Sequence, residues 1–158
     1  MKACRSQHYA PKSNMTATNH FLIGVGVSLI IKQPLLALPI SFASHLVADS
    51  LPHYGGGLSL TKVKYVWIFD ALCLSIALLF CWHYLGFYSV FVGFIATSPD
   101  LAWVYKFIIQ EKRGQLPPRP KSGFNKFHSI IQKYEKPYNW PFEFVYLALS
   151  LLFIRSMS

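Results

Sequence analysis

The feature that most constrains this chain is a series of five apolar runs separated by short polar segments. The runs are residues 21–31, 35–51, 65–82, 85–109 and 140–154. An uninterrupted apolar run of about 18 residues or more is typical of a membrane helix, whereas a shorter run is typical of a half-span or a buried helix. The first and last runs are short by this measure. We therefore predict an all-α fold, a polytopic membrane helix bundle of about five spans.

Composition decides between two explanations of the chain's basic character. The net charge of +9 is by itself typical of a protein that binds either nucleic acid or an anionic membrane surface. However, 53% of the residues are hydrophobic and only 13% are charged, against about 25% charged in soluble domains. This balance argues against a soluble enzyme and a disordered chain. We expect membrane lipids with anionic headgroups as partners and no nucleic acid, and the oligomeric state stays open.

The distribution of basic residues predicts the orientation in the membrane. Basic residues of short loops remain on the cytoplasmic side. With the N-terminus inside, all but two of the fifteen Lys and Arg residues fall on that side, and the exceptions are Lys32 and Arg155. We therefore expect a multi-pass protein with a cytoplasmic N-terminus. Residues 1–14 are predicted to form a flexible basic tail, with either Met1 or Met15 as the start, and residues 15–158 a single membrane-embedded helical domain.

A long polar segment, residues 112–136, separates the fourth and fifth apolar runs. It contains a proline-rich stretch at 116–120, after which Ser122 is a suitable N-cap for a short helix through Glu135. On a helical wheel, apolar side chains form one stripe and lysines lie broadly opposite. The apolar positions are Phe124, Phe127, Ile131 and Tyr134, and the lysines are Lys126, Lys133 and Lys136. This pattern predicts a short cytoplasmic interfacial helix on anionic lipid.

Ionisable residues within the apolar runs are the main functional signal. A charge inside a membrane span costs at least about 2.5–3.5 kcal/mol, so such residues usually face the bundle interior. Along the predicted second helix, His45, Asp49 and His53 recur every fourth residue and therefore form one continuous polar stripe. The predicted topology places this stripe at the cytoplasmic end of its helix.

The other spans carry ionisable residues at the same depth. His20 opens the first helix on its cytoplasmic side. Asp70, Asp100 and Glu143 all fall within about 5–10 Å of the same interface at 1.5 Å of rise per residue. Because scattered structural polar residues have no reason to share one depth and one leaflet, we predict that these side chains gather in a single pocket.

Several short motifs resemble a known family. They are Thr-Ala-Thr-Asn-His at 16–20, Ser-His-Leu-Val-Ala-Asp-Ser-Leu-Pro-His at 44–53, Ser-Pro-Asp at 98–100, Phe-His-Ser at 127–129 and Ile-Gln-x-x-Glu at 131–135. In this order they resemble small bacterial inner-membrane proteins described as membrane-bound metal-dependent hydrolases, above all the uncharacterised multi-pass members. That family has Pro-Asp-x-Asp-His, whereas this chain has Pro-Asp-Leu-Ala-Trp at 99–103. The resemblance, over most of 15–144, implies location in a bacterial cytoplasmic membrane.

A hydrolytic metal site typically needs three protein ligands and an open position for water, whose pKa the ion lowers. The chain offers enough imidazole and carboxylate groups for one such centre, and we predict as ligands His20, His45, Asp49, His53 and Asp100. Mixed nitrogen and oxygen ligation favours Zn²⁺ as the first choice, whereas a carboxylate-rich subset would suit Mn²⁺ or Mg²⁺.

The expected function follows from this centre. We predict a membrane-embedded hydrolase that cleaves a phosphoester or similar bond of a lipid-like substrate at the cytoplasmic leaflet, with His128 or Glu135 as acid or base. The alternative is a membrane protein without catalysis, in which the His/Asp cluster is a structural polar core or an element that binds ions or protons. For two of these residues a purely structural role also stays open. Asp100 could accept hydrogen bonds from backbone N–H groups near Pro99, and Asp70 could pair with a loop lysine.

Overall fold

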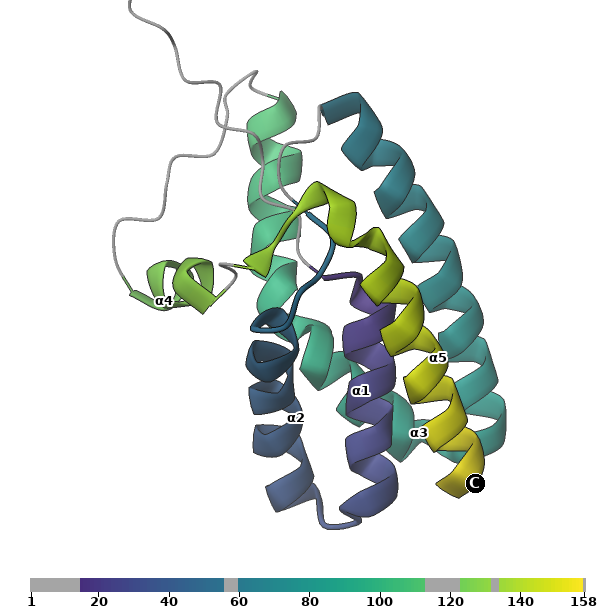
Figure 1. Ribbon diagram of the computed structural model, residues 1–158. Coiled ribbons are helices and arrows are strands. Elements are labelled where there is room, and N and C mark those ends of the chain that lie inside the picture. Colours follow the sequence, from purple (N-terminus) through teal and green to yellow (C-terminus); the bar gives the residue numbers. More distant parts are fainter. Residues whose placement is uncertain (1–14, 56–59, 113–122, 132–133, 158) are drawn as a thin grey trace, which may run out of the picture.

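The computed structural model describes residues 15–55, 60–112, 123–131 and 134–157 (Figure 1). The helices are α1 (Ala17–Ile30), α2 (Pro34–Asp49), α3 (Leu60–Lys112), α4 (Gly123–Ile131) and α5 (Trp140–Met157), with a 3-10 turn, η2 (Pro137–Asn139), before α5. Within these ranges the only β pairing is an isolated bridge between Tyr54 and Lys136. The prediction of an all-α fold is confirmed, while the predicted basic tail, residues 1–14, lies outside the described residues.

Helix α3 is a hairpin of two helical legs that meet at Gly86. This glycine has φ 79° and ψ 177°, a backbone conformation that side chains disfavour, so the helix breaks there. Asp70 on the first leg accepts a hydrogen bond from the backbone of Ala17, and Asp100 on the second leg lies 3.8 Å from His20. Because both legs reach the beginning of α1, they run antiparallel (Figure 1). All five predicted apolar runs are therefore helical.

Helix α1 is the centre of the bundle, with α2, both legs of α3 and α5 packed around it (Figure 1). Its residues Phe21 and Val25 are fully buried in an apolar core together with Cys81 and Val90 from the two legs of α3 and Ile154 from α5. Close packing of these side chains fixes the position of α1 relative to its neighbours.

The contact between α1 and the second leg of α3 is close because both helices present glycine. A Cβ atom added to Gly24 would lie 2.7 Å from the Cβ of Ala96, and one added to Gly93 would lie 2.7 Å from the ring of Phe21. Small residues let two helix backbones approach closely, and this arrangement is frequent in membrane helices. The close approach brings the polar end of α1 against the polar residues of α3.

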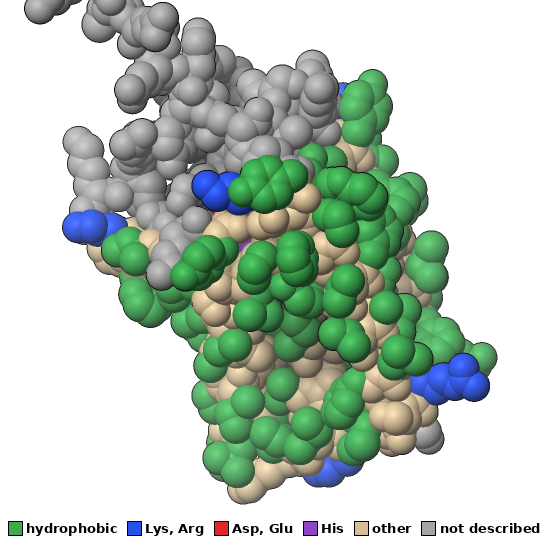
Figure 2. Space-filling model, in the orientation of Figure 1, with side chains coloured by type: hydrophobic (Ala, Val, Ile, Leu, Met, Phe, Trp, Pro, Cys, Tyr) green, Lys and Arg blue, Asp and Glu red, His purple; other side chains and the backbone are tan. Residues whose placement is uncertain are grey.

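The outer surface of the bundle is largely apolar along its sides, and the visible Lys and Arg side chains lie at its ends (Figure 2). Large side chains such as Leu35, Ile76 and Phe87 are 80%, 68% and 65% exposed. Two helical segments, Lys64–Leu101 and Trp140–Met157, are long and apolar enough to cross a membrane. Helices α1 and α2 are apolar but shorter, 14 and 16 residues.

The interfacial helix differs from the prediction at its end. Helix α4 begins at Gly123, one residue after the predicted cap, but ends at Ile131 instead of Glu135. The reason is a tertiary contact: the backbone N–H of Lys136 donates to the carbonyl of His53, and its carbonyl accepts from the N–H of Gly55. This extended pairing is incompatible with a helix through Glu135. The proline-rich stretch lies outside the part of the chain that the structure describes.

Candidate metal centre

Four elements bring histidine and aspartate side chains into one buried cluster near the end of the bundle where α1 begins. Helix α1 contributes His20, α2 contributes His45 and Asp49, the second leg of α3 contributes Asp100, and α4 contributes His128. The three histidines and Asp49 have no exposed surface, and Asp100 is 9% exposed. The predicted convergence of distant residues in one pocket is therefore what the fold shows for these five side chains.

A group of four within this cluster has the spacing of metal ligands. One ligand atom from each of His45, Asp49, Asp100 and His128 lies within 4.8 Å of all the others. The Nε2 atom of His45 lies 3.2 Å from Nε2 of His128, 3.3 Å from Oδ2 of Asp49 and 3.5 Å from Oδ1 of Asp100. Ligand atoms around a tetrahedral ion at about 2.0–2.2 Å are themselves separated by about 3.3–3.6 Å. This group can therefore hold one metal ion.

The orientation of the His45 ring is set by the backbone of α3. Its Nδ1 atom donates a hydrogen bond to the carbonyl oxygen of Ala96 at 2.8 Å, and since a carbonyl only accepts, the proton is on Nδ1. The Nε2 lone pair then points at the other members of the group. A histidine that ligates a metal through one nitrogen usually donates its other N–H to such a partner.

Pro99 shapes the segment of α3 that provides this carbonyl. A proline inside a helix removes the hydrogen bond to the residue four positions earlier, here Ile95. The hydroxyl of Ser98 donates to the Ile95 carbonyl at 2.8 Å and replaces the missing donor. The carbonyl of the next residue, Ala96, is the one that His45 uses. The Ser-Pro-Asp motif thus both positions Asp100 and shapes the helix opposite His45.

Histidine 20 lies beside the group of four, against the carboxylates of Asp49 and Asp100. Its Nε2 atom is 3.2 Å from Oδ1 of Asp49 and 3.8 Å from Oδ2 of Asp100. The ring stacks on that of His45, with 3.9 Å between centroids and 26° between planes. Neither ring nitrogen of His20 has a hydrogen-bond partner of suitable geometry within the described ranges. The two carboxylates are therefore what compensates the burial of this imidazole.

The remaining two predicted site residues, His53 and Glu135, are outside the group of four. His53 is fully buried, and its Nδ1 atom donates to the carbonyl of Leu51 at 2.8 Å. Glu135, 9% exposed, lies next to Lys136, whose backbone pairs with that of His53. The roles predicted for individual residues, ligation by His20 and His53 and acid–base catalysis by His128 and Glu135, stay predictions.

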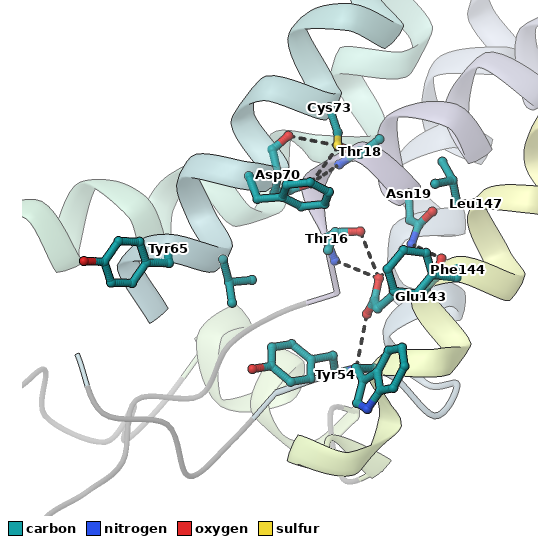
Figure 3. Close-up of a pocket in the computed structure, with 13 residues that line it drawn as sticks. Thr16, Thr18, Asn19, Tyr54, Tyr65, Asp70, Cys73, Glu143, Phe144 and Leu147 are labelled. Atoms are coloured by element: carbon teal, nitrogen blue, oxygen red, sulfur yellow. Dashed lines mark hydrogen bonds between the residues drawn. The ribbon is translucent and has the colours of Figure 1, made fainter. Parts of the chain in front are cut away.

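Two acidic residues that share the predicted depth hold the start of α1 in place. Asp70 accepts a hydrogen bond from the backbone N–H of Ala17 at 2.8 Å. It also accepts from the backbone N–H of Thr18 at 3.2 Å and from the Thr18 hydroxyl at 2.6 Å (Figure 3). The first N–H groups of a helix have no partner within it, and a negative charge there also interacts favourably with the helix dipole. Asp70 therefore caps α1 from α3, and no loop lysine is needed to explain it.

Glu143 on α5 connects three segments. Its Oε2 atom accepts from the side chains of Thr16 and Asn19 at 2.9 and 2.7 Å, and its Oε1 atom accepts from the backbone of Tyr54 at 3.1 Å (Figure 3). Because Tyr54 follows His53 directly and Asn19 precedes His20, this carboxylate fixes the chain next to two histidines. The sequence indicated the depth of Glu143, but the donors it serves are set by tertiary contacts.

The same network lies in the wall of a pocket with a volume of ≈ 540 Å³ between the first leg of α3 and α5 (Figure 3). Apolar lining comes from Val66, Phe69, Trp140, Phe144 and Leu147. The carboxylates of Asp70 and Glu143 in its wall accept hydrogen bonds from neighbouring protein groups. The pocket is thus mainly apolar. It lies beside α1, and its lining includes Asn19, the residue before His20.

The chain has no match among protein-family models, curated proteins or solved structures.

Proposed function

We propose that the protein is a membrane-embedded, metal-dependent hydrolase that cleaves a phosphoester or similar bond of a lipid-like substrate at the cytoplasmic leaflet. The observation that carries this proposal is the buried group formed by His45, Asp49, Asp100 and His128, whose ligand atoms all lie within 4.8 Å of one another. Two imidazoles and two carboxylates are a donor set that suits Zn²⁺ first, and also Mn²⁺ or Mg²⁺.

Electrostatics supports a cation in this position. Asp49 is fully buried, Asp100 is nearly so, and both carboxylates contact the same His45 nitrogen at 3.3 and 3.5 Å. Buried carboxylates this close together need a proton or a cation between them, because removal from water penalises each negative charge. A divalent ion would neutralise both charges at once.

The surface supports the membrane assignment. The sides of the bundle expose large apolar side chains, whereas every acidic side chain that the structure describes is buried or half-buried. An apolar surface of this extent marks contact with a membrane or another protein. A leg of α3 from Leu60 to the break at Gly86 is about 39 Å long, enough for a hydrocarbon core of about 30 Å.

We propose that the protein crosses a bacterial inner membrane five times, with the cluster at the cytoplasmic end of the bundle. Helices α1 and α2 are only about 21 and 24 Å long, so they need their polar ends close to the headgroups. The exposed residues Lys126 and Lys136 lie at this same end, beside His128 and His53. They fit anionic lipid headgroups and, equally, the phosphate of a substrate.

The chain's own residues divide the work as follows. His45, Asp49, Asp100 and His128 hold the ion, and the Ala96 carbonyl keeps the His45 lone pair directed at it. When bound, such an ion polarises the phosphoryl group and lowers the pKa of a water molecule. Glu135, next to the chain segment that pairs with His53, is the residue we propose to move the proton. The apolar pocket beside α1 suits the hydrocarbon part of a lipid.

A second function is favoured by one specific observation: the same side chains form histidine–carboxylate contacts by themselves. His128 contacts Asp49 directly, and His20 lies 3.2 Å from it. Such pairs can lock helices together, or bind a proton or an ion, without any turnover.

Metal analysis distinguishes the two functions. The full-length protein is purified in detergent and its metal content is measured alongside those of His45→Ala and Asp49→Ala. His83→Ala is the matched control, because His83 is exposed and lies three residues before the break at Gly86, away from the cluster. We expect bound metal in the wild type and the control and loss of it in the other two variants. Absence of metal from every sample would leave the structural polar core as the better explanation.

Turnover and topology need separate measurements. Metal-loaded protein is assayed with a panel of phospholipids and isoprenoid phosphates for release of phosphate or a headgroup. If metal-loaded protein turns over none of them, the protein is not a hydrolase of this substrate class.

To test the topology, alkaline phosphatase and green fluorescent protein are each fused to the C-terminus. Five spans with the N-terminus inside predict an active phosphatase fusion and a dark fluorescent fusion, and the reverse result would exclude this topology.

A further inference from the structure

We propose that the cluster binds two metal ions bridged by the carboxylates of Asp49 and Asp100, with His20 as a ligand of the second ion. This inference rests on the proposed function in so far as the cluster binds metal. It goes beyond it because it assigns a second site and a bridging role to both aspartates.

The first argument is that each carboxylate turns its two oxygens to different histidines. Oδ2 of Asp49 contacts His45 and His128, whereas Oδ1 of Asp49 lies 3.2 Å from His20. Asp100 repeats this division, with Oδ1 3.5 Å from His45 and Oδ2 3.8 Å from His20. A single ion accounts for one oxygen of each carboxylate, and the second oxygen of each is then directed at His20.

The second argument is the stacking of His20 on His45. Their ring centroids are 3.9 Å apart and their planes differ by 26°, so the two imidazoles lie nearly parallel. Both approach the same pair of carboxylates through Nε2. Metal ions in two-metal hydrolytic sites are about 3.5–4 Å apart. Parallel rings at this spacing are therefore arranged to serve one ion each.

The third argument is the state of His20 itself. The side chain is fully buried, and neither ring nitrogen makes a hydrogen bond of suitable geometry within the described part of the chain. Nε2 lies 3.2 Å from Asp49 and 3.8 Å from Asp100, a spacing close to that of ligands of one ion. A second ion bound by the two outer carboxylate oxygens would also be within reach of Nε2 of His20, which already faces both carboxylates.

His53 is positioned to complete the second site. Its Nδ1 atom donates to the Leu51 carbonyl, so the lone pair is on Nε2, which is buried and has no hydrogen-bond partner within the described ranges. Glu143 ties the two histidine segments together, because it accepts hydrogen bonds from Asn19, next to His20, and from Tyr54, next to His53. The four protein ligands of the second ion would then be His20, His53, Asp49 and Asp100.

The number of bound ions also determines which ligand charge the site prefers. One divalent ion is neutralised by the two bridging carboxylates, whereas two such ions leave an excess of positive charge in a buried site. This excess favours a ligand with two negative charges, such as a terminal phosphate group, over a neutral ester. Inorganic phosphate is accordingly a suitable probe for the loaded site.

The test uses the full-length protein in detergent, loaded with Mn²⁺ and freed of excess metal. Metal content gives the number of ions per chain, and electron paramagnetic resonance reports whether two Mn²⁺ ions are coupled. We expect two ions per chain and a coupled spectrum for the wild type and the His83→Ala control. We expect one ion and the spectrum of an isolated ion for His20→Ala. The shorter polar variant His20→Asn, which lacks the Nε2 ligand, should behave in the same way.

The outcomes separate the two proposals. One uncoupled ion per chain in the wild type, unchanged in His20→Asn, overturns the two-ion site and leaves the metal-dependent function standing. Absence of metal from the wild type overturns both. If His20→Ala fails to give a monodisperse protein, titration of the wild type with Mn²⁺ still decides: saturation at one equivalent without coupling contradicts the inference, and saturation at two with coupling supports it.

Discussion

The Nε2 atoms of His45 on α2 and His128 on α4 lie 3.2 Å apart in the buried interior, although the residues are 83 positions apart in the chain. Two imidazole nitrogens at this distance are either joined by one shared proton or directed at one cation. The Nδ1 proton of His45 is committed to Ala96, so its Nε2 atom can accept a proton from His128 or bind a cation. Occupation of the site by a metal would require Nε2 of His128 to give up its hydrogen bond to Asp49.

Removal of the metal is expected to destabilise the wild type. A ligand present at a hundred times its dissociation constant stabilises a protein by about 2.7 kcal/mol, because it binds the folded state alone. Addition of a chelator should lower the unfolding temperature of the wild type and leave that of His45→Ala unchanged. Differential scanning fluorimetry in detergent measures both, and an equal shift in the two proteins would argue against metal at this site.

The contact between Gly24 and Ala96 makes a matched pair of substitutions informative. In Gly24→Ala the new Cβ would lie 2.7 Å from that of Ala96, which forces α1 away from α3; such overpacking costs about 1–3 kcal/mol. We expect this variant to lose both stability and metal affinity, because His20 and Asp100 are carried by the two helices that separate.

Gly26→Ala is the control on the same helix. Its new Cβ would meet only the ring of Phe153, at 3.4 Å, and alanine favours helix over glycine. Its stability should equal or slightly exceed that of the wild type, and its metal content should be the same. Equal losses in the two variants, measured by thermal unfolding and metal analysis, would show that the α1–α3 contact is not specific.

Glu143→Gln tests whether this residue has a structural role. The side chains of Thr16 and Asn19 and the backbone of Tyr54 all donate to its carboxylate, so the amide of glutamine would place a donor against a donor. Loss of such a buried acceptor costs about 1–3 kcal/mol. We expect a lower unfolding temperature with unchanged metal stoichiometry, and loss of metal would instead assign Glu143 to the site.

Asp70→Asn removes the charge at the N-terminus of α1 but preserves the size of the side chain. Because the carboxylate accepts from Ala17 and Thr18, we expect a loss of about 0.5–2 kcal/mol, as for a helix cap. Ser75→Ala is a suitable control: its hydroxyl, on the same leg of α3, donates only within its own helix, to Ala71. If the unfolding temperature of Asp70→Asn is no lower than that of this control, the proposed cap does not contribute to stability.

The sequence predicted the helices and the convergence of the polar residues because both follow from local periodicity. The spacing of His45 and Asp49 on one helical face, and the common depth of Asp100 and His20, required only the rise per residue. Depth, however, does not say which atoms face each other. The division of the Asp49 oxygens among three histidines depends on how α1, α2 and α4 rotate about their axes.

Other features depended on contacts that no local pattern contains. His128 was predicted as an acid or base, and α4 brings it into the group with ligand spacing. Glu135 was expected on a helix, but the pairing of Lys136 with His53 and Gly55 extends the chain there. Asp70 carries the same chemistry as Asp100 at the same depth, and only its donors on α1 reveal that it supports the helix.

The distribution of the cluster over four elements has a consequence for biosynthesis. A chain made from its N-terminus presents His20, His45 and Asp49 early and Asp100 after the turn at Gly86, while His128 emerges only after all of α3 has left the ribosome. The group of four side chains is therefore complete only after α4 has emerged. If the group binds a metal, insertion has to follow helix packing, because the nascent chain before that point offers an incomplete set of donors.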